Sequence, residues 1–503
     1  MTLHMTPLTP MWIGILIAGY FLLLFAISRF SGKTTDNATF FLAGRKTHWI
    51  WIAIGMIGAS LSGVTFISIP GVVGTDGLNS NFSYFQVVLG YLLGYAVIAL
   101  VLLPLYYRLN LTTIYGYLEQ RFGRTSYKTG AAFFLLSRII GASFRMFLVV
   151  MVLDQFVLGP FGIPMWVTIA TSIALIWTYT QHNGMRTIIF TDVLQTVFML
   201  SAVGLTIYFI GHQMQLSPLR ALREVHDSNY SQIFSFSGGW SDPNNFFKQF
   251  FSGALITIVM TGLDQDMMQK NLACRTLGES QKNMFTFCIV LVIANLMFLS
   301  MGALLYLYAD FAQIALPGKS DQLYPTIAMN HLPVAVGAVF IIGLIAAAYS
   351  SADSALAALT TSFCVDFLDL ERSKRPDHEQ TRIRRWVHLG MSAMLFLVIL
   401  GFSSIHNQAV ITKLFEVAGY TYGPILGLFA FGLLTSRQVN DRLVLPLAIL
   451  SPLLTWMLNT WSDTLLAGFK LGFLVIAVNG ILMFIGLLFI SRRTPKTDAV
   501  VFQ

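Results

Sequence analysis

The sequence has few charged residues. It contains 31 Lys and Arg and 23 Asp and Glu among 503 residues, which is 11% of the chain, whereas soluble domains carry roughly 25%. The hydrophobic share is 55% and the mean hydropathy is +0.69. A soluble fold of this size could not cover its surface with so few charges. A soluble enzyme, a disordered chain and a nucleic-acid-binding protein are therefore excluded, despite a pI near 9.3.

Cysteine is also scarce. Cys274, Cys288 and Cys364 fall in or beside apolar runs, and their spacing suits neither a disulfide framework nor a metal site. They are expected to be small apolar helix residues. No HExxH, CxxC or Ser/His/Asp arrangement appears. A membrane enzyme is thus the least favoured class, and no cofactor is expected.

Long apolar runs fill most of the chain. Residues 47–75, 77–107, 155–185 and 193–219 contain no charged residue, and one membrane crossing needs about 20 apolar residues. We predict an all-α polytopic membrane protein that forms a single transmembrane domain over residues 1–503. The thirteen predicted spans, numbered in chain order, are 10–28, 49–74, 82–107, 130–154, 164–182, 187–211, 247–268, 284–309, 332–362, 386–404, 410–435, 442–461 and 466–491.

The positions of Lys and Arg predict the orientation. With the N-terminus outside, 23 of the 31 basic residues lie in cytoplasmic segments and only four lie in outside segments. This bias favours an N-out, C-in arrangement with an odd number of crossings. The first run has no basic region before it and is expected to be a retained span. From the ten residues that follow Arg493, no appended signalling module is expected.

The second span is rich in helix-loosening residues. Gly, Ser and Thr occupy six of the positions 55–65, and Pro70-Gly71 closes the span. Small residues in a membrane helix can mean close packing only. At this density we favour an unwound segment, whose free backbone groups can bind ions.

The ninth span carries oxygen ligands on one helical turn. Ser350, Ser351, Asp353 and Ser354 sit at relative positions 0, 1, 3 and 4, which share a face. This set is typical of a cation site. The alternative is that the serines bond back to their own helix and Asp353 pairs with an arginine. Asp192, near the start of the sixth span, has an equally simple alternative as a helix-capping acid.

The fourth span contains two arginines. Arg138 and Arg145 are two turns apart, roughly 10 Å along one face. Either could hold an anion, because Arg makes bidentate contacts to carboxylates. Either could instead pair with Asp192, Asp353 or Asp154, and the sequence does not separate the two roles.

The seventh span breaks at a Thr-Gly pair. From there the chain enters a polar stretch at 260–283, and Asp264, Gln265 and Asp266 are expected near its cytoplasmic end. They could gate the inner mouth or simply cap a helix.

Four segments together resemble the sodium:solute symporter family, which contains sodium–glucose, proline, pantothenate and sialic acid symporters. They are FFLAGRK (40–46), TDVLQ (191–195), DQDMMQKNLACRT (264–276) and GYTYGPILGLFAFGLL (419–434). Each is weak alone, but their order and spacing are specific. Lys270 stands where the family usually has Arg.

The resemblance implies a leucine-transporter-type fold with a five-plus-five inverted repeat. The first repeat would be 49–211, the second 247–435, and two accessory helices would follow at 442–491. Spans two and seven would be the broken helices, and alternating access would proceed around a site at the membrane midplane.

The resemblance also implies ion sites. The main sodium site would be formed by Gly58, Leu61, Ala347, Ser350 and Ser351. A second sodium, held by some family members, would involve Asp192, Asp353 and Ser354. The family more often has a small or hydroxyl residue at position 353, so Asp353 is a departure that could bind sodium or carry a proton.

Substrate contacts carry over less directly. The hydroxyl positions of sialic acid symporters match Ser60, Ser62 and Thr65. Their arginine aligns near Gly141, between Arg138 and Arg145, and their third-span glutamine has only Gln86 nearby. The set of expected substrate residues is Ser60, Ser62, Thr65, Gln86, Arg138 and Arg145.

The predicted function is secondary active symport. An inward sodium gradient would drive uptake of a small polar, anionic solute such as a sugar acid across a plasma membrane, expected to be a bacterial inner membrane. The partners would be the solute, sodium and the lipid bilayer, with no nucleic acid, and a monomer would suffice. The alternatives are a proton-coupled symporter of the same fold and a transporter-like sensor that only binds its ligand.

Overall fold

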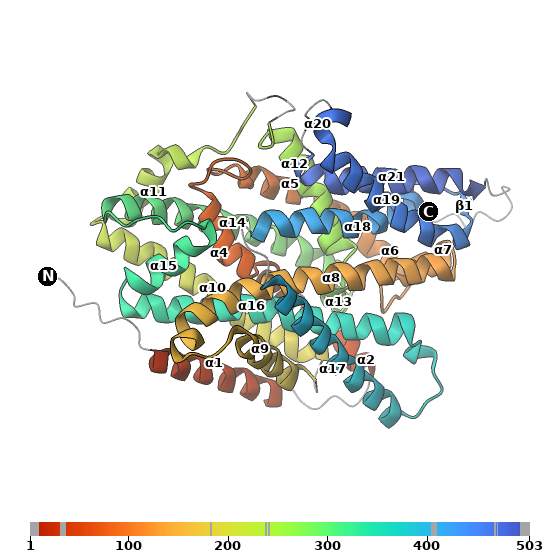
Figure 1. The fold of residues 1–503 in the computed structure, drawn as a ribbon. Coiled ribbons are helices and arrows are strands. Elements are labelled where there is room, and N and C mark those ends of the chain that lie inside the picture. Colours follow the sequence, from red (N-terminus) through yellow and green to blue (C-terminus); the bar gives the residue numbers. More distant parts are fainter. Residues whose placement is uncertain are drawn as a thin grey trace.

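The computed structural model describes residues 10–30, 37–181, 184–236, 239, 242–403, 410–466, 469 and 471–492, and these form a bundle of long helices (Figure 1). The helices are α1 Pro10–Phe30, α2 Asn37–Leu42, α3 Trp49–Ser60, α4 Gly63–Val72, α5 Tyr84–Val97, α6 Leu103–Arg108, α7 Gly116–Arg121, α8 Arg124–Leu153, α9 Met165–Thr180, α10 Gly184–Gln213, α11 Pro218–Asp227, α12 Phe246–Thr257, α13 Gln265–Asn271, α14 Leu277–Phe311, α15 Leu323–Asn330, α16 Val334–Ser362, α17 Asp377–Phe402, α18 Val410–Leu434, α19 Val444–Thr460, α20 Ser462–Leu465 and α21 Val475–Phe489. Strands β1 Gln438–Val439 and β2 Ser491–Arg492 form one short antiparallel pair. The segment after Arg492, where the sequence predicts a short tail, lies outside the described residues.

The described helices are long and apolar enough for many membrane crossings. Ten of them meet the length and hydropathy required of a span, and two bent helix pairs raise the number to twelve. The apolar helix α9 is shorter, at 16 residues. The prediction of a polytopic helical membrane protein is confirmed at this level, although the described chain is mostly and not entirely helical, because it also contains the strand pair β1–β2.

Helix α16 lies at the centre of the bundle. Alanine and serine dominate its middle, and almost every side chain from Ile345 to Ser362 is buried. Small residues let neighbouring backbones approach closely in a membrane protein, and α16 packs along both α10 and α8. Helices α1 and α9 lie together at one edge of the bundle, whereas α19 and α21 lie on the opposite side (Figure 1). Polar side chains on α16 can therefore meet only protein groups or bound solutes.

Two helices are broken, at the positions that the sequence indicated. The chain bends by 54° between α3 and α4, where Leu61 and Ser62 leave the helical conformation. It bends by 69° between α12 and α13, after the π-helical turn Ile258–Gly262. π-Helical turns often mark functional sites. The predicted unwinding of the second span and the Thr-Gly break of the seventh are both confirmed.

Two local predictions have clear outcomes. The three cysteines are buried and free, and Cys288 and Cys364 lie in helical segments as expected, whereas Cys274 lies in the connection between α13 and α14. The interpretation of Asp192 as a helix-capping acid is wrong, because α10 begins at Gly184 and Asp192 lies more than two turns inside it, fully buried. A carboxylate at that depth needs partners from other helices.

Candidate functional site

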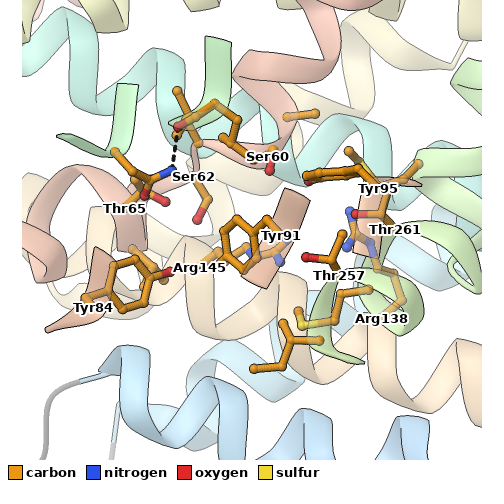
Figure 2. A pocket seen from close by; sticks show the side chains of 18 residues that line it. Ser60, Ser62, Thr65, Tyr84, Tyr91, Tyr95, Arg138, Arg145, Thr257 and Thr261 are labelled. Carbon is orange, nitrogen blue, oxygen red and sulfur yellow. Dashed lines mark hydrogen bonds between the residues drawn. The ribbon is translucent and has the colours of Figure 1, made fainter. Parts of the chain in front are cut away.

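A cavity of about 90 Å³ lies between the two broken helices (Figure 2). Its lining comes from α3 and α4 at their break, from α5, α8 and α12, from the π-helical turn after α12, and from α13 and α14. The hydroxyl-bearing side chains that line it are Ser60, Ser62, Thr65, Tyr84, Tyr91, Tyr95, Thr257 and Thr261. A volume of this size holds several water molecules or one small solute. The site is thus a polar chamber inside an otherwise apolar bundle.

Arg145 of α8 projects at this cavity without a counter-charge (Figure 2). Its Nε is buried and has no hydrogen-bond partner. No acidic side chain of the described chain lies within ion-pairing distance of its guanidinium. The Arg145 side chain as a whole is partly buried, and a partly buried cation without a partner is less favourable than a paired one. Arg145 can therefore bind a negatively charged group in the chamber.

Arg138, two turns earlier on α8, also lines the cavity but is already paired. Its guanidinium forms an ion pair with Asp266 of α13 and lies 3.7 Å from Asp264. The Tyr422 hydroxyl of α18 donates to Asp264 as well. The expectation that the arginines pair with Asp192, Asp353 or Asp154 is wrong for Arg138. These groups lock α8, α13 and α18 together beside the chamber.

Asp264 also caps a helix. Its Oδ1 accepts from the backbone N–H groups of Asp266 and Met267, which satisfies the start of α13. The neighbouring Gln265 binds the backbone at Thr112 and Ile114. Helix capping is therefore confirmed for Asp264, whereas a role of these residues in gating the inner mouth stays a prediction.

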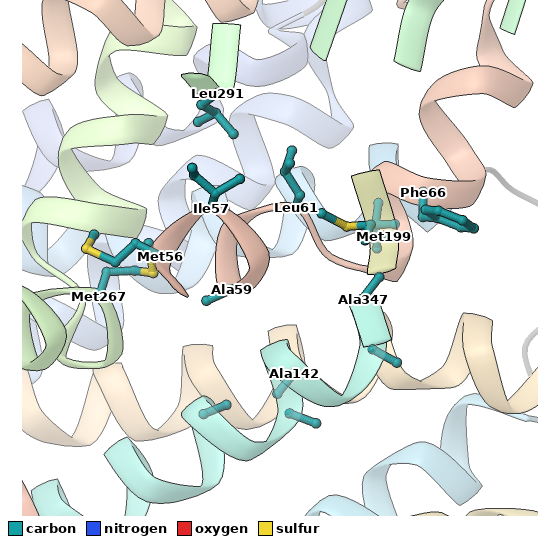
Figure 3. Close-up of a cluster of buried hydrophobic side chains, with 14 of the residues drawn as sticks. Met56, Ile57, Ala59, Leu61, Phe66, Ala142, Met199, Met267, Leu291 and Ala347 are labelled. Atoms are coloured by element: carbon teal, nitrogen blue, oxygen red, sulfur yellow. The ribbon is translucent and has the colours of Figure 1, made fainter. Parts of the chain in front are cut away.

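The break after α3 frees a backbone carbonyl. In a continuing helix the Ser62 N–H would bond to the Gly58 carbonyl, but it bonds to the Ser60 carbonyl at 3.0 Å instead. Figure 3 shows this region, with Leu61 at the break and Ala347 on α16. A Cβ on Gly58 would come within 2.4 Å of the Thr196 hydroxyl. Only glycine allows this close approach.

The two predicted sodium-binding serines face the break from α16. The Ser351 hydroxyl donates to the Ala59 carbonyl at 3.2 Å, and the Ser350 hydroxyl donates to Asp192 Oδ1 at 2.6 Å. The Ser350 oxygen also lies 3.3 Å from where a Gly58 Cβ would stand. A hydroxyl that donates its proton keeps lone pairs for a cation. The donor set at this point fits a small hard cation.

Asp192 meets a buried lysine. Its Oδ2 lies 2.6 Å from Lys270 Nζ of α13, and both side chains are inaccessible to solvent. The Ser354 hydroxyl is 3.4 Å from the same oxygen. The Gln195 amide nitrogen, oriented toward Asp192, donates to Oδ1 at 3.1 Å. Gln195 and Lys270, from two of the motif segments, thus converge with Ser354 on one carboxylate.

Asp353 points to a different helix. Its Oδ2 accepts from the Tyr179 hydroxyl of α9 at 2.8 Å, and its Oδ1 accepts from the Ser354 backbone N–H. Ser350 and Ser354 face Asp192, whereas Ser351 faces α3. The prediction that the four residues share one face is therefore wrong, because the two-residue step from Ser351 to Asp353 turns the side chain about 200° around the helix axis.

Gln86 lies outside the chamber. Its amide nitrogen donates to the Asn244 carbonyl at 2.8 Å, and its oxygen accepts from the Ser235 N–H at 3.2 Å. It does not line the cavity. The side chain holds the loop before α12 against α5, in contrast to the predicted contact with substrate.

Sequence reasoning missed several residues of the site. Tyr84, Tyr91 and Tyr95 line the chamber from α5, and the Tyr84 and Tyr91 hydroxyls are 2.9 Å apart. Their spacings of seven and four residues place them on one face of a charge-free helix. That polar stripe was a readable signal. The contacts of Lys270 and Tyr422 left no such signal, because their partners are far away in the sequence.

Comparison with known proteins identifies the family. The model of the sodium:solute symporter family matches residues 40–442. This chain belongs to the sodium:solute symporter family. The family is one of sodium-coupled transporters and not of enzymes. The chain is accordingly a multi-pass membrane transporter.

Individual relatives are distant. The human sodium/iodide cotransporter is 23% identical over 413 residues, which span 80% of this chain and 62% of that protein. The sodium/sialic acid symporter of Aliivibrio fischeri is 25% identical over 433 residues, which span 82% and 80%. The solved structure of a sodium-coupled sialic acid symporter, in a substrate-bound outward-open state, matches with a TM-score of 0.80 at 20% identity. This match covers 95% of this chain and 97% of that one, and shows that the fold is shared.

Proposed function

We propose that this protein is a sodium-driven symporter that imports a small organic anion. One observation carries the proposal: Arg145 faces a hydroxyl-lined chamber and has no acidic partner among the described residues. A solute anion would supply the missing charge. The solutes in the names of the two relatives, iodide and sialic acid, are both acidic or anionic species.

The chamber suits a carboxylate that carries hydroxyl groups. The guanidinium of Arg145 matches a carboxylate with two parallel hydrogen bonds. The hydroxyls of Ser60, Ser62 and Thr65 can pair with hydroxyls of the solute. In this conformation the volume fits a short carboxylate. A sugar acid would require the chamber to widen as the broken helices move.

Sodium would bind at the break itself. The proposed ligands are the carbonyls of Gly58 and Leu61 on one side, and the Ala347 carbonyl with the Ser350 and Ser351 hydroxyls on the other. The released Gly58 carbonyl and the position of Ser351 support this set. An ion held there would fix the break that carries Ser60 and Ser62. Sodium and solute would thereby raise each other's affinity.

We further propose thirteen crossings with the N-terminus outside. The ten long helices, the two bent pairs and the shorter α9 supply the segments. The inverted repeats would be residues 49–211 and 247–435, and 442–491 would be accessory. The membrane would be the plasma membrane, of the bacterial inner-membrane type. The ion pair of Arg138 with Asp266 would close the cytoplasmic side and would have to part during transport.

Transport in proteoliposomes tests this proposal. Purified protein would be offered short hydroxycarboxylates, sugar acids, neutral sugars and amino acids, with an inward sodium gradient, a potassium gradient or a pH gradient. We expect uptake of an anion with sodium only, and loss of that uptake in Arg145→Gln. Arg223→Gln on α11, an exposed arginine far from the chamber, is the matched control.

Three results would contradict the proposal. Uptake driven by the pH gradient without sodium would make protons the coupling ion. Binding of a solute without any uptake would indicate a sensor. Uptake of neutral solutes alone, unchanged in Arg145→Gln, would show that the transported solute is not an anion bound by Arg145.

A further inference from the structure

The carboxylate of Asp192 already holds a cation that belongs to the protein. The ammonium of Lys270 lies 2.6 Å from Oδ2, and the exposed fractions of Lys270 and Asp192 are 1% and 0%. Nothing else in the described chain forms an ion pair with either group. The pair joins α13, the short arm after the second break, to α10. The ion pair therefore connects α13, which is expected to move during transport, to α10, which is expected to stay in place.

The remaining positions around Asp192 are also filled. Oδ1 accepts from the Ser350 hydroxyl at 2.6 Å and from the Gln195 amide at 3.1 Å, and Ser354 lies 3.4 Å from Oδ2. The carboxylate is thus neutralised and hydrogen-bonded on both oxygens. A free sodium ion at this place would meet a like charge in a low-dielectric interior, where the repulsion is strong. The residues present do not fit a second sodium ion.

We propose that the Lys270 ammonium stands in for a second coupling ion, so that one sodium ion accompanies each solute. This inference rests on the proposed function. A tethered ammonium supplies the charge that Asp192 needs, but it cannot cross the membrane. It therefore contributes nothing to the driving force. The main site at Ser350 and Ser351, whose Ser350 hydroxyl contacts Asp192 Oδ1, keeps the single transported ion.

The number of sodium ions per solute determines the net charge that each transport cycle moves. One sodium ion with one monovalent anion carries no net charge, so transport by the native protein is electroneutral. Without Lys270, the buried Asp192 carboxylate would lack a counter-ion, which is strongly unfavourable. A second sodium ion would then fill the place, and each cycle would carry one positive charge inward.

The experiment compares four proteins in two assays. Native protein, Lys270→Met, the charge-neutral double variant Lys270→Met with Asp192→Asn, and Lys282→Met would be purified. Lys282, an exposed lysine on α14, is the matched control. The first assay counts sodium ions bound per protein by equilibrium binding of labelled sodium to purified protein. The second measures uptake of the anion with and without an imposed inside-negative membrane potential.

The expected results differ in kind between the variants. Native protein and Lys282→Met bind one sodium ion, and their uptake does not respond to the potential. Lys270→Met binds two sodium ions, and the potential accelerates its uptake. The double variant returns to one sodium ion, because the charge that attracts the second ion is gone.

Several outcomes would overturn the inference while leaving the proposed function intact. Two sodium ions bound by the native protein, with uptake driven by the potential, would show that Lys270 replaces no ion. One sodium ion in Lys270→Met, with unchanged affinity, would show the same. If Lys270→Met does not fold, the ion count of the native protein still decides. Absence of any sodium binding to the native protein would instead contradict the proposed function.

Discussion

Two arginines on the same helix have opposite surroundings. Arg138 is matched by Asp266 and Asp264, which come from the neighbouring broken helix. Arg145, seven residues later, faces a chamber and has no acidic partner in the described chain. Their residue type and helix are the same, and only the neighbours differ. A buried charge that is already paired holds the protein together, whereas one left unpaired is available to a solute.

The largest expected effect comes from unpairing Arg138. In Arg138→Gln, two buried carboxylates lose their cation, and breaking a buried ion pair costs about 3–5 kcal/mol. We expect a marked fall in the thermal unfolding midpoint of purified protein. Adding Asp266→Asn should recover most of the loss. An unchanged midpoint in Arg138→Gln would show that the pair is not structural.

The next effect is on solute affinity. Arg145→Gln removes one charge-assisted contact, which is worth about 1.5–3 kcal/mol, or roughly a tenfold to hundredfold rise in KM. Little change in stability is expected, because no protein group loses a partner. The measurement is sodium-driven uptake over a range of solute concentrations. If KM stays constant while stability falls, the two arginines have been assigned the wrong way round.

The helix breaks could be predicted from the sequence, but the ion pair of Arg138 with Asp266 could not. Helix interruption is local: Gly58, Ser60 and Ser62 lie within five residues, and their composition predicted the unwinding that the structure shows. Arg138 and Asp266 are 128 positions apart. The sequence therefore named both partners and could not match them, because their meeting depends on how α8 and α13 pack.

Tertiary packing also explains why Asp353 and Gln86 do not lie where the sequence predicted them. Asp353 was expected among the cation ligands, and the pitch of α16 turns it to Tyr179 instead. Gln86 was expected at the substrate from its approximate position in the third span. Its amide instead forms hydrogen bonds with the loop before α12. Residue type and spacing predicted the polar side chains of the site, whereas the choice of partner is a tertiary property.

A smaller effect is expected from the loss of a serine hydroxyl, and it separates a hydroxyl of the proposed sodium site from one bonded to its own helix. Ser351→Ala removes one proposed sodium ligand, and we expect the half-saturating sodium concentration to rise about tenfold, as for one lost contact to a charged group. Ser392→Ala on α17, a buried serine bonded to its own helix, is the control and should have no such effect. Equal sodium dependence of the native protein and Ser351→Ala would remove Ser351 from the ion site.

The smallest effect is expected at Gln86. Its amide is satisfied by the loop, so Gln86→Ala should change solute KM by less than about twofold, while loosening the loop by the roughly 0.5–1.5 kcal/mol of a typical hydrogen bond. Uptake kinetics would measure the change in solute KM, and limited proteolysis would measure the loosening of the loop. A tenfold or larger rise in KM would return Gln86 to the substrate site.

Ligand-induced thermal stabilisation tests the central claim most directly. Native protein, Arg145→Gln and the double variant Arg138→Gln with Asp266→Asn would be heated with the transported anion, in sodium and in potassium. We expect the anion to stabilise the native protein and the double variant in sodium only, and to leave Arg145→Gln unstabilised. Equal stabilisation of Arg145→Gln, or stabilisation that persists in potassium, would contradict the claim that Arg145 binds the solute of a sodium-coupled site.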